Sequence, residues 1–138
     1  MFGGISHDET ITVLEQGLDT AALRQQVISN NIANVNTPGF KRSYVTFETE
    51  LREVLSREKG KLEARRTHPK HIHFGRMDLS KTGGQVVIED YTLYRNDENN
   101  VDVDAEMTDL AKNTIMYEAL ATRIGGKFKL LKRVIMSK

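Results

Sequence analysis

Two long segments with heptad spacing, one near each end of the chain, constrain the fold more than any other feature. In the first, residues 11–35, a stripe recurs at alternating intervals of three and four residues, and Gln25 is its polar member. This spacing is typical of a helix that packs along another helix in a coiled coil. The stripe consists of Ile11, Leu14, Leu18, Ala21, Gln25, Ile28, Ile32 and Val35.

The second segment, residues 104–136, repeats this pattern at the same intervals. Asp104 is its predicted N-cap, and Gly125 and Gly126 mark a candidate kink or a place where another backbone comes close. We therefore predict a mostly α-helical fold in which two long terminal helices pair as a coiled coil. The second stripe consists of Met107, Leu110, Thr114, Tyr117, Ala121, Ile124, Phe128, Leu131 and Ile135.

The distribution of charge favours antiparallel pairing of these helices. The net charge is only +1, but residues 89–109 carry eight acids and one base, whereas residues 110–138 carry seven bases and one acid. The first helix also begins acidic and runs toward Arg24, Lys41 and Arg42. Antiparallel pairing sets each acidic start beside the other's basic end, although the dipole preference of each helix alone would give the same layout.

The remaining segments suggest one core domain with a polar insertion. Residues 1–40 and 102–138 form the core, and residues 41–101 form a polar middle that we expect to be mobile or ordered by a partner. Tyr44, Phe47 and Leu51 predict a short helix in this middle. Residues 85–89 predict a strand, in a small hairpin with residues 91–95.

The apolar content indicates that one chain cannot bury all of its own apolar surface. Hydrophobic residues make up 38% of the sequence and Trp is absent. Each terminal helix carries apolar side chains beside its stripe, so a single partner helix leaves part of them uncovered. We expect neighbouring copies or related chains to cover them, and the free monomer to be only partly folded.

Metal, redox and enzymatic chemistry find little support in the sequence. The chain has no Cys, which excludes disulfides and thiolate metal sites. His68, His71 and His73 lie around Pro69, which breaks any helix face, so a solvated basic loop is favoured over a zinc site. No phosphate-binding glycine loop and no nucleophile motif occurs. We predict no cofactor, no metal and no catalysis.

The basic stretch of residues 57–81 is interpreted as a docking surface for an acidic protein. It holds eight bases, but Phe74 is its one aromatic residue, whereas binding of single-stranded nucleic acid usually uses several stacking rings. A basic helical nucleic-acid-binding protein remains the alternative from another class. No apolar run reaches the ~20 residues of a membrane span. The first ten residues lack the pattern of a cleaved signal peptide, which predicts a cytoplasmic protein unless export is signal-independent.

Residues 29–42, S-N-N-I-A-N-V-N-T-P-G-F-K-R, end the first helix with an unusual number of asparagines. Pro38 and Gly39 fit the two central positions of a type II turn, because Gly tolerates the positive φ required at the second. A helix end leaves only about four carbonyls to satisfy. The surplus predicts contacts with a neighbouring subunit from Asn30, Asn31, Asn34 and Asn36; the alternative is that they only end the helix.

The string N-N-I-A-N-V-N-T-P-G-F-K-R resembles the N-terminal signature of the bacterial flagellar rod and hook proteins. Residues 95–107, R-N-D-E-N-N-V-D-V-D-A-E-M, are similar to the rod-protein pattern R-x-D-G-N-N-V-D-x-D-x-E-M. Glu98 stands where this pattern has Gly, which puts a tight turn there in question. The resemblance covers residues 1–56 and 90–138 well, and the middle weakly.

This resemblance implies a structural subunit of the proximal rod of the flagellar basal body. Such a subunit polymerises through its terminal helices into a hollow, torque-transmitting shaft in the periplasm, at the membrane ring. The implied partners are other copies, other rod proteins, ring and rod-base proteins, and the flagellar type III export apparatus, which needs no cleaved signal peptide. A neighbouring rod subunit without a large outer domain is the alternative. The predicted assembly interface comprises Leu14, Leu18, Gln25, Ile28, Asn30, Asn31, Ile32, Asn34, Asn36, Pro38, Gly39, Leu110, Tyr117, Ile124, Phe128 and Leu131.

Overall fold

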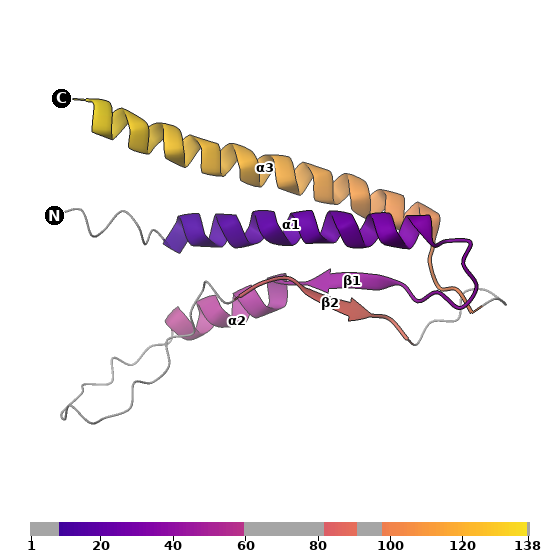
Figure 1. Cartoon of the computed structure of the whole chain (residues 1–138). Helices are drawn as coiled ribbons and strands as arrows, with labels where there is room; N and C mark the ends of the chain where they lie inside the picture. Colours follow the sequence, from indigo (N-terminus) through magenta and orange to yellow (C-terminus); the bar gives the residue numbers. More distant parts are fainter. Residues whose placement is uncertain (1–8, 60–81, 91–97, 138) are drawn as a thin grey trace, which may run out of the picture.

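The computed structural model describes residues 9–59, 82–90 and 98–137, and these form a mostly helical fold. Two long helices, α1 (Glu9–Ala33) and α3 (Val103–Met136), lie side by side (Figure 1). Between them in sequence come the strand β1 (Ser43–Thr46), the short helix α2 (Glu48–Lys59) and the strand β2 (Gln85–Ile88). The predicted fold class is confirmed: the fold is mostly helical, with long terminal helices in contact and a middle that holds a short helix and a two-stranded antiparallel sheet.

The two long helices run in opposite directions, as the charge pattern predicts. Three contacts fix the register along the pair: Asn31 Nδ2 donates to Glu106 Oε2, Asn113 Nδ2 donates to the Ala21 carbonyl, and Gly17 faces the Leu120 side chain. A Cβ added at Gly17 would lie 3.2 Å from Leu120 Cδ1, so this glycine allows a close approach. Glycine is therefore used here for packing, which offsets its poor helix propensity.

The face that α3 turns toward α1 is not centred on the predicted stripe. Glu106 and Asn113 are buried at 0% and 3% exposure, whereas Met107, Phe128 and Ile135 of the stripe are 52%, 54% and 72% exposed. The stripe prediction is therefore wrong for these positions of α3, since the helix is rotated so that two polar side chains face inward. Glu106 and the amide nitrogen of Asn113 find hydrogen-bond partners there, whereas Asn113 Oδ1 is buried without one among the described residues.

The start and the course of α3 also differ from expectation. Asp102 is the N-cap, and its Oδ1 accepts hydrogen bonds from the backbone N–H groups of Asp104 and Ala105, at 2.9 and 3.4 Å. The prediction of Asp104 as the cap is wrong, because Asp104 already lies in the first helical turn. The helix runs through Gly125 and Gly126 without interruption, and a Cβ at either position would meet nothing within 4 Å.

The middle of the chain contributes a two-stranded antiparallel sheet. Ser43 pairs with Ile88 and Thr46 with Gln85. Tyr44 therefore lies in a strand and not in the predicted helix, which starts later, at Glu48. The strand β2 pairs with β1, and residues 91–95, which were predicted to pair with residues 85–89, lie outside the described residues. The sequence S-Y-V-T of β1 is aromatic and β-branched, as suits a strand.

A small core holds this sheet and α2 against α1, which lies between them and α3 (Figure 1). A Cβ added at Gly84 would lie 2.8 Å from Val45 Cγ1 and 3.0 Å from Thr20 Cγ2, so the strand entry is packed tightly on α1. The buried apolar side chains are few, as the composition indicates. They are Ala21, Ile28, Val45, Phe47, Val54 and Val101. None of the helices described is long and apolar enough to cross a membrane.

Candidate functional site: the lock between the two signature segments

The asparagine-rich segment ends α1 and turns the chain as predicted. The Phe40 N–H donates to the Thr37 carbonyl at 3.3 Å, which closes a four-residue turn. Gly39 has φ of 72°, in the left-handed region, so the predicted need for glycine at this position is confirmed. Asn34 Nδ2 donates to the Asn30 carbonyl and to Asn30 Oδ1, at 2.8 and 2.9 Å, and these two side chains thus bond to each other.

Asn99, in the second signature segment, satisfies the carbonyls at the end of α1. Its Nδ2 lies 3.0, 3.1 and 2.9 Å from the carbonyl oxygens of Asn34, Val35 and Thr37. Its own Oδ1 accepts from the Val101 N–H at 2.8 Å. Asn99 is completely buried. One amide therefore caps a helix end that lies more than sixty residues earlier in the chain.

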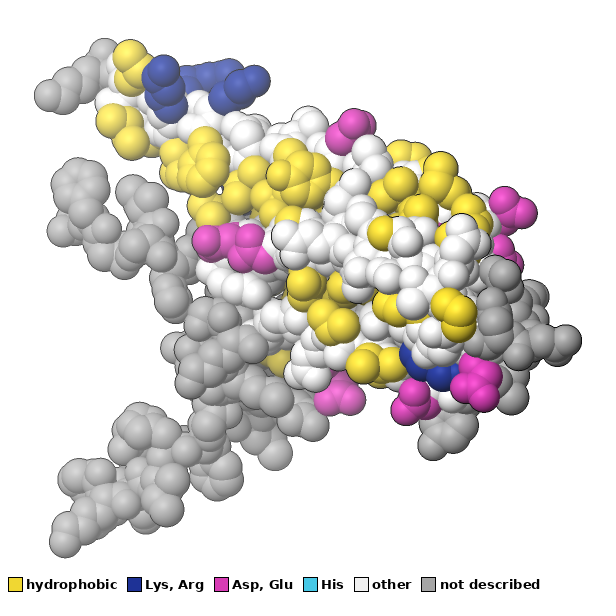
Figure 2. Space-filling view, turned by 45° about the vertical axis from the view of Figure 1, so that its right-hand side comes forward, with side chains coloured by type: hydrophobic (Ala, Val, Ile, Leu, Met, Phe, Trp, Pro, Cys, Tyr) yellow, Lys and Arg dark blue, Asp and Glu magenta, His cyan; other side chains and the backbone are white. Residues whose placement is uncertain are grey.

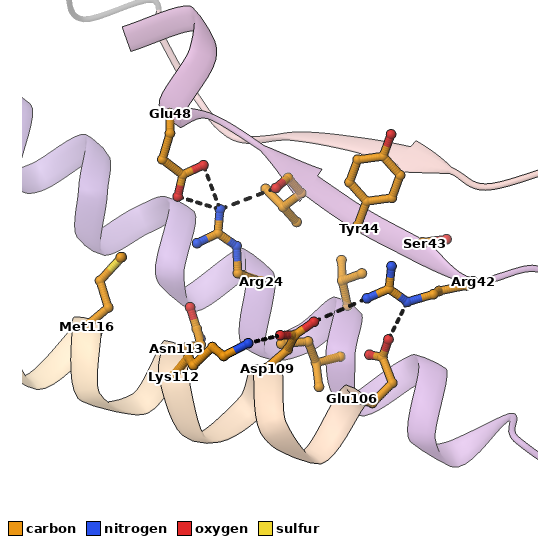
Figure 3. A pocket seen from close by; sticks show the side chains of 13 residues that line it. Arg24, Arg42, Ser43, Tyr44, Glu48, Glu106, Asp109, Lys112, Asn113 and Met116 are labelled. Carbon is orange, nitrogen blue, oxygen red and sulfur yellow. Dashed lines mark hydrogen bonds and ion pairs between the residues drawn. The ribbon is translucent and has the colours of Figure 1, made fainter. Parts of the chain in front are cut away.

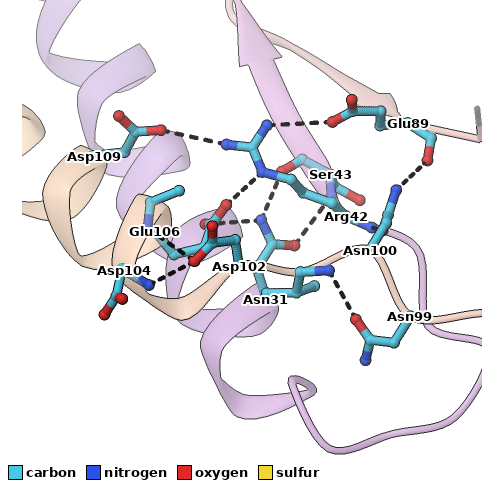
Figure 4. Close-up of polar contacts among 12 residues, drawn as sticks. Asn31, Arg42, Ser43, Glu89, Asn99, Asn100, Asp102, Asp104, Glu106 and Asp109 are labelled. Carbon is cyan, nitrogen blue, oxygen red and sulfur yellow. Dashed lines mark hydrogen bonds and ion pairs between the residues drawn. The ribbon is translucent and has the colours of Figure 1, made fainter. Parts of the chain in front are cut away.

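Arg42 and Glu106 form the charged centre of the same contact (Figure 4). Arg42 Nε lies 2.5 Å from Glu106 Oε1, and its two terminal nitrogens lie 3.3 Å from Glu89 Oε2 and from Asp109 Oδ2. Burial opposes the charge of Arg42, but its hydrogen bonds and ion pairs with Glu106 and Glu89 outweigh burial and raise its pKa. A carboxylate with no exposed surface, as in Glu106, is tolerable only with such partners.

Two further asparagines hold residues 42 and 43, which follow the turn: Asn31 from α1, and Asn100 from the segment that precedes α3. Asn31 Nδ2 donates to the Ser43 carbonyl at 2.7 Å and to Glu106 Oε2 at 3.0 Å, and Asn31 Oδ1 accepts from the Ser43 N–H at 3.1 Å. Asn100 Oδ1 accepts from the Arg42 N–H at 2.6 Å. The Asn100 amide donates to the Glu89 carbonyl at 2.8 Å. We call this set of Asn31, Arg42, Asn99, Asn100 and Glu106 the lock.

The lock was not among the predicted site residues, except for Asn31. Arg42, Asn99, Asn100 and Glu106 all lie inside the two strings that carry the family resemblance, and this could have pointed to them. Asn31 has no exposed surface and bonds within its own chain. The role of the predicted interface residues in assembly stays a prediction.

The structure distributes these predicted residues over three environments. The buried ones lie on α1, the exposed ones lie on α1, at the turn and on α3, and the rest are half-buried along the two long helices or at the turn. Ile28 and Asn31 are buried; Leu14, Leu18, Ile32, Asn34, Leu110, Ile124 and Leu131 are half-buried; Gln25, Asn30, Asn36, Pro38, Gly39, Tyr117 and Phe128 are exposed.

A cleft of about 400 Å³ opens beside the lock, between β1 and the two long helices (Figure 3). Arg24 Nη2 lies 2.8 Å from Glu48 Oε1 across it and also donates to the Val45 carbonyl at 3.3 Å. Burial tends to raise the pKa of Glu48, but hydrogen bonds from its own backbone N–H and from Arg24 lower it overall. The ion pair of Arg24 and Glu48 therefore joins α1 to α2.

Neither candidate metal ligands nor the basic stretch can be placed. His68, His71, His73 and residues 60–81 lie outside the described residues. Among the residues that are described, no three His, Cys, Asp or Glu side chains gather as a metal site.

The fold and the lock define a class of protein. The ion pairs and amides described above hold the end of α1 against the start of α3, and the helices present apolar side chains outward. This is the construction of a structural subunit that assembles with other chains.

Comparison with known proteins identifies the family. The family described as "Flagella basal body rod protein" matches residues 11–41. The "Flagellar basal body rod protein FlgB" of Bacillus subtilis is 43% identical over 91% of this chain and 92% of its own length. The protein of that name from Borreliella burgdorferi is 37% identical over 86% of this chain and 89% of its own. The Escherichia coli protein is 29% identical over 94% and 95%.

The chain belongs to the FlgB family of flagellar basal body rod proteins. It is a structural, non-enzymatic component of the rod, as the resemblance implied. These relatives support neither the alternative of a neighbouring rod subunit nor that of a nucleic-acid-binding protein.

Proposed function

We propose that this chain builds the proximal rod by polymerising through its two long helices, with other copies of itself and with other rod proteins. The shaft so formed is hollow, transmits torque and stands at the membrane ring, in contact with ring and rod-base proteins. The chain reaches it through the flagellar type III export apparatus. Assembly with other rod proteins follows from the family, and the faces used are the subject of the proposal.

The exposed heptad positions of α3 carry this proposal. Met107, Tyr117, Phe128 and Ile135 keep coiled-coil spacing and are 52%, 45%, 54% and 72% exposed, because α3 turns a different face toward α1. Apolar side chains with coiled-coil spacing that α1 leaves exposed form a surface on which another helix can pack. A neighbouring subunit is the source of such a helix in a rod.

Phe128→Asp tests this proposal in cells that lack the native copy. Because the Phe128 side chain is 54% exposed, the substitution should change the stability of the isolated protein by less than about 1 kcal/mol. It should nevertheless abolish swimming and remove rods from purified basal bodies, since the charge would have to enter a buried interface.

Ala111→Asp is the matched control, because Ala111 is exposed on the same helix and outside the stripe. It should leave rods and swimming intact. Normal rods in the Phe128→Asp strain, at normal subunit levels, would show that the stripe is not an assembly face.

A further inference from the structure

The two strands of the sheet differ in what lies along their outer edges. In an antiparallel pair, the backbone groups of successive residues point alternately toward the partner strand and away from it. The Glu89 N–H donates to the Arg42 carbonyl at 2.8 Å, so the backbone groups of Glu89 face β1. Those of Val87, two residues earlier, also face β1. The N–H and C=O groups of Val86 and Ile88 therefore point outward, along the outer edge of β2.

The outer edge of β1 is closed by side chains of α1, since Asn31 bonds to both the N–H and the carbonyl of Ser43. Arg24 also donates to the Val45 carbonyl, at 3.3 Å. The strand β2 lies on the far side of β1 from α1 and α3 (Figure 1). Within the part of the chain that the structure describes, no hydrogen bond reaches the outward backbone groups of β2. Such an open edge is a template for another extended strand.

The sequence of β2 does not discourage such pairing. Edge strands are commonly protected by charged side chains, Pro or bulges, but residues 82–88, T-G-G-Q-V-V-I, contain no charge and no Pro. Val86 and Ile88 are β-branched, lie on one face of the sheet and are 50% and 61% exposed. Figure 2 shows that hydrophobic side chains are exposed along α3 too, but a helix satisfies its own backbone. On β2 they stand beside open backbone groups.

We propose that the outer edge of β2 pairs with the same edge of a second copy, in antiparallel orientation. The two-stranded sheets of the two copies then form one sheet of four strands. With Val87 opposite its counterpart, Val86 of each copy lies opposite Ile88 of the other. Every outward N–H at these positions meets an outward carbonyl, and the Val86 and Ile88 side chains of both copies pack together. The edge is therefore complementary to itself.

The residues that flank this contact fit the same register. Glu89 lies opposite Gln85 of the second copy. Asp90 lies opposite Gly84, so no two like charges are opposed. Because both copies use the same surface, the contact is isologous and closes at two copies. It cannot extend into a shaft, so it belongs to the free protein and goes beyond the proposed function.

Paired substitutions test the contact and its register. Val86→Lys and Ile88→Glu each place a charge on the edge; both side chains are exposed and outside the lock, so circular dichroism of the dilute protein should match the wild type. Dimerisation is measured by sedimentation velocity over a concentration series. Each variant alone should dimerise at least about tenfold more weakly than the wild type, because a charge then faces an apolar side chain. An equimolar mixture should regain dimers, since the two introduced charges are opposite in sign and face each other.

Two controls separate this contact from others. Ile115→Glu changes an isoleucine on α3 that is 69% exposed, and this variant should dimerise like the wild type. A mixture of Val86→Lys and Val86→Glu carries the same pair of charges at positions that do not face each other, so it should regain fewer dimers than the first mixture. The difference between the two mixtures reports the register.

Hydrogen exchange of the backbone amides, followed by NMR, gives a second measurement. The N–H groups of Val86 and Ile88 should exchange at least about tenfold more slowly in concentrated than in dilute wild-type protein, because pairing protects them. The Val87 N–H faces β1 and should be protected at both concentrations.

Several results would overturn the inference. These are a wild type that stays monomeric at its highest soluble concentration, edge variants that dimerise like the wild type or like Ile115→Glu, and a first mixture that gains nothing over its components. Protection of Val86 and Ile88 in the dilute monomer would also overturn it, by showing that the same chain covers the edge. Protection that appears only when another rod protein is added would assign the edge to that protein instead. Rod formation in the Phe128→Asp strain reports on the proposed function separately.

Discussion

At the scale of single residues, Glu98 and Asn99 show how a short segment can serve a distant one. The amide nitrogen of Asn99 donates to three carbonyls at the end of α1. The backbone before Asn99 must turn sharply to bring this side chain to the end of α1. Glu98 makes that turn with φ of 62°, in the left-handed region, where the rod-protein pattern has Gly. The turn is therefore kept despite the substitution, at the cost of backbone strain.

Glu98→Gly should stabilise the protein by about 1 kcal/mol, because glycine adopts this φ without a Cβ clash. The Glu98 carbonyl that accepts from Lys41 Nζ at 2.8 Å is part of the backbone and remains. The measurement is urea unfolding, followed by circular dichroism, of the variant and the wild type at equal concentration.

Gly39→Ala is the opposite control. Gly39 also has positive φ, and a Cβ there would meet nothing within 4 Å, so only backbone strain is added. The free energy of unfolding of the Gly39→Ala variant should be about 1 kcal/mol lower than that of the wild type. Equal stability of the Glu98→Gly variant and the wild type would show that Glu98 is not strained.

At the scale of elements, the sheet depends on one close contact with α1. A Cβ at Gly84 would approach Val45 and Thr20, which are 6% and 2% exposed and have no room to withdraw. The φ of Gly84 lies outside the left-handed region, so alanine there brings no backbone strain. The glycine is required by packing alone.

Gly84→Ala should therefore destabilise the protein by about 1–3 kcal/mol through overpacking. Gly126→Ala, in an open part of α3, should instead stabilise the isolated protein by about 1 kcal/mol, since alanine favours the helix. Thermal unfolding of both variants against wild type gives the comparison. If Gly84→Ala unfolds at the wild-type temperature, the sheet does not depend on this contact.

Elements with a strong repeat were predictable from the sequence, and the others were not. The stripe of α1 was correct at Ala21 and Ile28 because apolar residues do face its neighbours. The stripe of α3 failed because Glu106 and Asn113 face inward, and polar residues are normally assigned to solvent. Strand β1 was missed because four residues carry too little periodicity, and Tyr44 fitted a helical spacing equally well.

The lock could not be predicted from the sequence, for a related reason. Its members are ordinary polar residues, and the hydrogen bonds that join residues 31–42 to residues 99–109 span 58 to 75 residues of sequence. No local pattern states which asparagine caps a helix and which faces solvent. The resemblance marked both strings but could not say that they meet each other.

At the scale of the whole molecule, the lock joins the end of α1 to the start of α3 through Glu106. Both groups that bind its carboxylate, Asn31 Nδ2 and Arg42 Nε, are hydrogen-bond donors. A carboxylate accepts from both at once, whereas an amide has one acceptor and one donor side. An isosteric amide therefore opposes one donor with another.

Glu106→Gln should accordingly destabilise the fold by about 3 kcal/mol, because Arg42 loses its buried partner. Asp109→Asn, which alters a pair whose carboxylate is 40% exposed, should lose less than about 1 kcal/mol. Urea unfolding followed by circular dichroism compares the two. Equal losses in both variants would show that burial of Glu106 gives its ion pair no special weight.

The long stretch of sequence between Asn31 and Glu106 also sets the order in which the molecule can form. Closing a loop of this length costs conformational entropy before any contact repays it, whereas α1 forms from contacts that are local in the sequence. A chain made from its N-terminus completes α1 while Asn99 and Glu106 do not yet exist. Until the last third of the chain arrives, the end of α1 keeps its carbonyls open and Arg42 has no Glu106 to bind, so the native state is reached only as synthesis finishes.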